Sequence, residues 1–103
     1  MIPLETIIAQ KNAVLALFGG DQCNVCTAIK PKIEEMLHMH FPHMHFVYID
    51  CATHPETCAH QCVWSIPAVK VWFAGKLSGQ WARAFSIEQL RQHIQRPYTL
   101  LFS

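Results

Sequence analysis

The run Ala13–Phe18 is the feature that most constrains how this chain can fold. All six of its residues are apolar, and it ends at Gly19 and Gly20. A strand with one face in water would alternate apolar and polar residues, whereas an unbroken apolar run of this length is typical of a strand buried on both faces. In 103 residues there is room for one α/β or α+β domain and for no second core.

Helix and strand patterns follow one another along the chain, with no internal repeat and no linker. A capping box, Ser86 with Gln89, indicates where the last helix begins. In chain order, the predicted elements are a helix over Leu4–Gln10, a strand over Ala13–Phe18, a helix over about Val25–Phe41, a strand over His45–Asp50, a short helix over Pro55–Val63, two hairpin strands over Ala68–Phe73 and Leu77–Ala84, and a helix from Ser86 that ends before an apolar tail, Arg96–Ser103.

Composition excludes several classes of protein. Hydrophobic residues make up 51% of the chain and charged residues 15%, which argues against disorder. The formal net charge is +1, so there is no excess of positive charge to hold a nucleic-acid backbone. The longest apolar run is far too short for a membrane span. We therefore expect neither nucleic-acid nor membrane partners.

The motif Cys23-Asn24-Val25-Cys26 lies between the buried strand and the start of a helix. At a helix start, free backbone amides and the helix dipole stabilise an anion, and a thiol pKa can fall there from about 8.5 to about 3.5–7.5. Cys26 lies one turn further in and should be more buried. The spacing therefore predicts that Cys23 attacks an external disulfide and that Cys26 resolves the mixed disulfide by thiol–disulfide exchange.

Two other interpretations of this motif remain open. Cys23 and Cys26 could be half of a zinc site, which needs about four ligands and so requires distant cysteines to converge. They could also be packed core thiols, in a binding module whose cysteines have no redox role.

The order of these elements resembles the thioredoxin family over nearly the whole chain. The motifs that carry the resemblance are the CxxC at Cys23 and Cys26, Pro31 five residues later, Ile66-Pro67 before a strand, and Phe73-Ala74-Gly75-Lys76 in the hairpin. The resemblance implies an α/β fold with a central mixed sheet of about four strands flanked by helices on both faces. It also implies one thioredoxin-like domain over residues 1–103.

The resemblance further implies a thiol–disulfide oxidoreductase that reduces protein disulfides, in electron transport for cell redox homeostasis. Cys23 and Cys26 would be the catalytic residues, and Ile66 and Pro67, joined by a cis peptide bond, would contact the substrate. The redox-active Cys23–Cys26 disulfide would be the only redox group, with no metal and no other cofactor. The expected partners are protein disulfides and a thiol reductant, and the expected state is a monomer or weak dimer. Met1–Glu5 has no features of a signal peptide, so we expect a cytoplasmic protein.

The chain departs from the family pattern near the motif. Leu17 and Phe46 stand where the family has a buried acid and its lysine partner, which manage the proton of the second cysteine. Cys26 must therefore lose its proton to water, to substrate or to another group. Gln22 replaces a tryptophan, and Arg83 replaces a glycine used in partner docking, so docking to an ordinary thioredoxin reductase is not expected.

Three further cysteines, Cys51, Cys58 and Cys62, follow the second predicted strand. We expect them to pack as small apolar thiols between helix and sheet. The alternatives are a zinc or copper site completed by His54 and His60, and a second redox pair that includes Cys51. A histidine- and methionine-rich run, His38–His45, is a second candidate for metal binding, although we expect it to be a helix end and a solvated loop.

Overall fold

The computed structural model describes residues 2–103. Four strands form one mixed sheet in the order β2-β1-β3-β4. β1 runs parallel to β2 and antiparallel to β3, and β3 runs antiparallel to β4. The strands are β1 (Ala13–Gly19), β2 (His45–Asp50), β3 (Ala68–Phe73) and β4 (Lys76–Ala82). The prediction of a mixed sheet of about four strands is confirmed.

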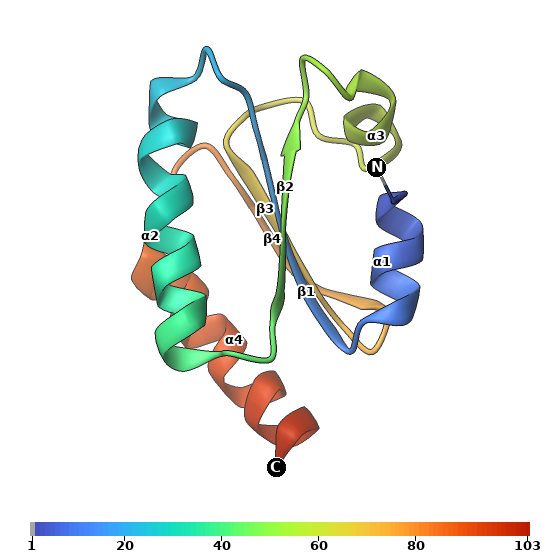
Figure 1. Cartoon of the computed structure of the whole chain (residues 1–103). Coiled ribbons are helices and arrows are strands. Elements are labelled where there is room, and N and C mark those ends of the chain that lie inside the picture. Colours follow the sequence, from blue (N-terminus) through green and yellow to red (C-terminus); the bar gives the residue numbers. More distant parts are fainter. Residues whose placement is uncertain (1) are drawn as a thin grey trace.

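Helices cover both faces of this sheet (Figure 1). One face carries α1 (Leu4–Gln10) and α3 (Pro55–His60), and the other carries α2 (Asn24–His40) and α4 (Ile87–Phe102). Every residue of β1 is buried, because its alternate side chains enter two separate cores. Leu15 and Leu17 pack toward α2 and α4, while Phe18 packs toward α1 and α3. The burial of the Ala13–Phe18 run on both faces is therefore confirmed.

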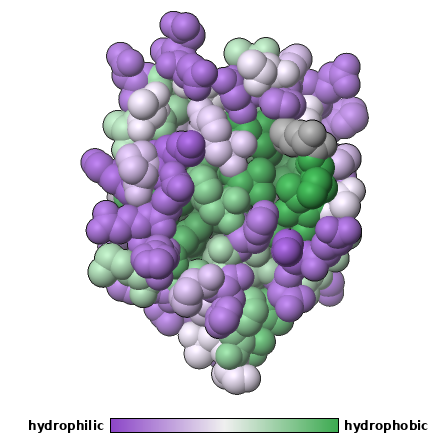
Figure 2. All heavy atoms as spheres, viewed as in Figure 1, coloured by the Kyte–Doolittle hydropathy of each residue, from purple (hydrophilic) through white to green (hydrophobic). Residues whose placement is uncertain are grey.

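β2 is an edge strand, and five of its six residues are only half-buried. In Figure 2, hydrophobic surface runs down the middle of the face on which Figure 1 shows β2, with hydrophilic side chains on the side of α2. Within residues 2–103, no helix has the length and apolar character needed to cross a bilayer.

Two helix ends differ from the sequence prediction. α3 ends at His60 instead of Val63. Cys62, two residues further on, has a positive φ of 57°, whereas every residue of a right-handed α-helix has a negative φ. α4 begins at the predicted capping box but runs through Pro97 to Phe102, where we expected a tail.

Tyr98 explains the extra length of α4. Its ring lies 4.9 Å from that of Phe41 and 4.6 Å from that of Phe102, measured between ring centres. Its hydroxyl accepts a 2.9 Å hydrogen bond from the amide of His43. This packing outweighs the one backbone hydrogen bond that Pro97 removes from the helix.

Candidate active site

The turn between β1 and α2 places Cys23 at the beginning of the helix. The Cys23 amide donates to the Gly20 carbonyl at 3.0 Å, which closes the turn, and Cys23 is the N-cap residue of α2. Its Sγ accepts a 3.2 Å hydrogen bond from the Cys26 amide. The sulfur thus takes the place that a serine or aspartate oxygen has in most N-caps.

The start of α2 favours a thiolate at Cys23. The first turn of α2, which the structure describes in full, contains no acidic side chain. The positive end of the helix dipole is therefore not neutralised from within its own helix, and it remains available to a negative charge on Cys23 Sγ.

Cys23 and Cys26 form a disulfide between Cα atoms 5.2 Å apart. Cys23 is partly exposed, whereas Cys26 has no exposed surface. This difference matches the expectation that the second cysteine, one turn inside the helix, is the more buried of the two. Of these two cysteines, only Cys23 has surface that an incoming molecule can contact.

Gly19 makes room for the buried cysteine. A β-carbon at position 19 would lie 2.9 Å from Cys26 Cβ, 3.2 Å from Cys26 Sγ and 3.1 Å from the hydroxyl oxygen of Tyr48. From the sequence we expected Gly19 only to end the strand. Its contact with Cys26 depends on how α2 packs on β1, which a local sequence pattern does not reveal.

Ile66 and Cys23 line one cavity of about 380 Å³. Ile66 is 38% exposed, and its peptide bond to Pro67 is cis. Pro67 is buried, and its carbonyl accepts a 2.9 Å hydrogen bond from the Arg83 amide. The other residues around the cavity are Gly19, Gly20, Asp21, Gln22, Asp50, Ala52 and Thr53. The fold thus brings Ile66 beside Cys23 and adds a wall of Asp50, Ala52 and Thr53 that the sequence did not predict.

The family profile that matches this chain is that of thioredoxin, over residues 4–96. The chain belongs to the thioredoxin family. A thioredoxin-like protein of Bacillus subtilis, YdfQ, is 25% identical over 100 residues, which are 97% of this chain and 88% of that protein.

Solved thioredoxin structures resemble the fold closely. Thioredoxin from Fasciola hepatica superposes with a TM-score of 0.80 at 26% identity, over 90% of this chain and 89% of that one. Thioredoxin 1 from Thermosipho africanus gives a TM-score of 0.77 at 26% identity, over 84% and 96% of the two chains. With its bonded CxxC pair at a helix start, this thioredoxin domain has the arrangement of a thiol–disulfide oxidoreductase.

The departures from the thioredoxin pattern have a structural consequence. Leu17 is completely buried on β1, and Phe46 packs against the same core from β2. Neither side chain can accept or donate a proton. The acid and the lysine that thioredoxins carry at these places have no replacement at the same two positions.

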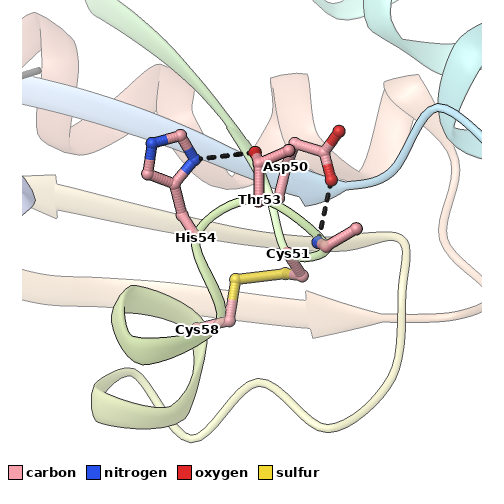
Figure 3. Close-up of a disulfide and its surroundings, with 6 residues drawn as sticks. Asp50, Cys51, Thr53, His54 and Cys58 are labelled. Atoms are coloured by element: carbon pink, nitrogen blue, oxygen red, sulfur yellow. Dashed lines mark hydrogen bonds between the residues drawn. A yellow bond between two sulfur atoms is a disulfide. The ribbon is translucent and has the colours of Figure 1, made fainter.

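Cys51 and Cys58 form a second disulfide, so our expectation that they pack as apolar thiols is wrong (Figure 3). Their Cα atoms lie 5.8 Å apart. The chain turns sharply after β2: Asp50 Oδ1 accepts from the Ala52 amide at 2.8 Å, and the Asp50 carbonyl accepts from the His54 amide at 2.9 Å. The predicted strand end and the proline at the start of α3 were the sequence signals for this reversal.

The second disulfide also removes ligands from the zinc or copper site that was the alternative interpretation of these cysteines. The sulfurs of Cys51 and Cys58 are bonded to each other, and Cys62 is free and exposed. His54 Nδ1 lies 2.9 Å from Thr53 Oγ1 (Figure 3). Across residues 2–103 the structure gathers no three His, Cys, Asp or Glu side chains into a metal-binding group.

The histidine-rich run is divided between different surroundings. His38 and His40 lie exposed in the last turn of α2. His43 stacks on Phe102, with ring centres 5.3 Å apart. His45 begins β2, where burial lowers its pKa and the positive charge of Lys11 lowers it further. The run therefore contains the predicted helix end and loop.

Proposed function

We propose that this protein reduces disulfide bonds in other proteins, with Cys23 as the nucleophile and Cys26 as the resolving thiol. The observation that supports this most directly is the contrast between a partly exposed sulfur at a helix N-cap and a fully buried one bonded to it. The helix start favours the thiolate of Cys23, which is the form that attacks a disulfide.

The reaction consists of two exchange steps. The Cys23 thiolate attacks one sulfur of the substrate disulfide, so that a mixed disulfide forms and the other substrate sulfur leaves as a thiolate that takes a proton from solvent. Cys26 then loses its proton and attacks Cys23 Sγ, which releases the remaining substrate sulfur. Two electrons thereby pass from the Cys23/Cys26 dithiol to the substrate.

Ile66 and Pro67 are the proposed substrate contacts. Ile66 presents apolar surface in the cavity that also contains Cys23. Because the Pro67 carbonyl is already bonded to the Arg83 amide and Pro67 is buried, most of the accessible surface in this pair belongs to Ile66. An apolar side chain beside the cystine of a protein substrate would pack there.

An external thiol reductant returns two electrons to the Cys23–Cys26 disulfide in this proposal, and no metal or organic cofactor takes part. We place the reaction in the cytoplasm, where cellular reductants keep most thiols reduced. The working form in this proposal is a monomer or weak dimer. Arg83 is exposed where thioredoxins carry a docking glycine, so the reductant should differ from ordinary thioredoxin reductase.

Insulin reduction with dithiothreitol as electron donor tests the two roles. Cys23→Ser should abolish turnover, and Cys26→Ser should accumulate a mixed disulfide with insulin at Cys23. Cys62→Ser, at the exposed cysteine outside both disulfides, is the matched control and should keep normal activity. Equal rates in wild type and Cys23→Ser would refute the proposal.

Equilibration with glutathione buffers tests the direction of electron transfer. A reductase requires a Cys23–Cys26 potential more negative than that of the cytosolic glutathione pool. A much less negative value would make the protein an oxidant, and a pair that never exchanges with glutathione would indicate a binding module.

A further inference from the structure

Tyr48 lies next to the sulfur that must lose a proton. The point where a β-carbon of Gly19 would lie is 3.1 Å from the Tyr48 hydroxyl oxygen and 3.2 Å from Cys26 Sγ. The hydroxyl and the buried sulfur therefore border the same small space above Gly19, which stays open only because residue 19 has no side chain.

The sheet register and α2 together direct Tyr48 to this place. Tyr48 pairs with Leu17 of β1, and both pack into the core beneath α2 and α4. The ammonium of Lys30 lies 4.8 Å from the centre of the Tyr48 ring. Lys30 follows Cys26 by four residues and so shares its side of the helix. Cation–π attraction to Lys30 thus holds the ring along α2 with its hydroxyl end near Cys26.

The Tyr48 hydroxyl has a proton to donate. Burial raises the pKa of Tyr48, and the carboxylates of Asp50 and Asp21 raise it further, so the phenol is protonated at neutral pH. Within residues 2–103 of this oxidised structure, no hydrogen bond joins that hydroxyl to another protein group. A disulfide sulfur is a weak acceptor, whereas a thiolate is a strong one.

We propose that the Tyr48 hydroxyl donates a hydrogen bond to the Cys26 thiolate during resolution of the mixed disulfide. This inference rests on the proposed role of Cys26 as the resolving thiol. Tyr48 keeps its proton throughout: the Cys26 proton passes to solvent, the Cys26–Cys23 bond forms, and the Cys23–substrate bond breaks. The hydroxyl thereby stabilises the Cys26 thiolate, and the positive charge of Lys30 beside the Tyr48 ring acts in the same direction. Asp21 and Asp50, whose negative charges raise the pKa of Tyr48, oppose a further negative charge near that hydroxyl.

The test is the pH profile of the resolving step in Tyr48→Phe, which removes the hydroxyl and keeps the ring. In a background with Cys51→Ser, Cys58→Ser and Cys62→Ser, the reduced protein reacts with 5,5′-dithiobis(2-nitrobenzoate) and releases two chromophores in sequence. The first release reports attack by Cys23 and the second reports attack by Cys26.

Tyr48→Phe should leave the first release unchanged and slow the second about tenfold or more at neutral pH. The apparent pKa of the second step should rise by about 1–2 units, because a hydrogen bond to a charged group is worth that much. The two proteins should converge at high pH, where Cys26 is ionised in both. Tyr98→Phe is the matched control, because its hydroxyl bonds to the His43 amide on another part of the fold.

Acid-quench peptide mapping of Cys23 adducts repeats the comparison in the chain with all five cysteines. An unchanged second step in Tyr48→Phe, or an equal shift in Tyr98→Phe, would overturn the inference about Tyr48 alone. If no adduct forms on Cys23 in either protein, the proposed function itself fails.

Discussion

At the scale of single residues, the site depends on two sulfurs and on one absent side chain. Cys23 both caps α2 and offers the reactive atom, so the same hydrogen bond from the Cys26 amide serves helix formation and thiolate stabilisation. Gly19 is what allows Cys26 to lie against β1. A short sequence motif therefore acts only because a glycine four residues earlier removes a steric conflict.

Gly19→Ala should destabilise the protein, because its methyl group would lie 2.9 Å from Cys26 Cβ in a packed region. Overpacking of this kind costs about 1–3 kcal/mol, measurable as a lower free energy of unfolding in urea. Disulfide reduction should slow as well, since the start of α2 must shift. Gly20→Ala is the control: its methyl group would meet only ordinary contacts, at 3.6 and 3.7 Å, and normal stability is expected. Equal losses in both variants would contradict this account.

At the scale of secondary-structure elements, α4 and α3 differ in what stabilises their first turns. α4 begins at a complete capping box, in which Ser86 Oγ accepts from the Gln89 amide and Gln89 Oε1 accepts from the Ser86 amide. α3 has only six residues and no side-chain hydrogen bond at its N-cap. A helix this short has little stability of its own, so the Cys51–Cys58 disulfide and the turn after Asp50 hold it in place.

Removing the second disulfide with the double substitution Cys51→Ala and Cys58→Ala should lower the free energy of unfolding by about 2–3 kcal/mol, the chain-entropy value for a loop of this length. Chemical denaturation without reductant measures the change. Cys62→Ala, which breaks no disulfide, should leave the unfolding midpoint nearly unchanged. A double variant as stable as wild type would show that turn and packing alone position α3.

At the scale of the whole molecule, the site forms where three chain segments meet at one end of the sheet. Gly19 pairs with Asp50 at the ends of two parallel strands, and Phe18 pairs with Ala68 at the start of β3. The Cys23 turn, the Asp50–Thr53 turn and the Ile66–Pro67 segment extend from these three strand ends. The cavity beside Cys23 therefore depends on sheet topology rather than on any one segment.

Ile66→Asp should weaken the reduction of protein disulfides by placing a charge on the apolar contact beside Cys23. Loss of a partly buried isoleucine contact corresponds to about 1 kcal/mol, so kcat/KM for insulin should fall roughly fivefold. Leu77→Asp is the matched control, because Leu77 is similarly exposed but pairs with Trp72 toward the far end of the sheet. A similar fall in both variants would argue against a substrate contact at Ile66.

The sequence by itself determined the type and order of the elements and the position of the CxxC motif. The apolar run Ala13–Phe18 and the Ser86–Gln89 capping box are local patterns, which are recognised from the residue types and their spacing alone. The placement of Cys23 at a helix start follows from the same local information.

Only the tertiary structure decided which distant groups meet. The Cys51–Cys58 disulfide, the extension of α4 to Phe102 through Tyr98, and the approach of Tyr48 to Cys26 all depend on contacts across the fold. Such contacts form only after strand pairing has set the register and helix packing has brought the surfaces together. The periodicity of a single segment carries no information about which distant residues come into contact. These three features could therefore not be predicted from the sequence.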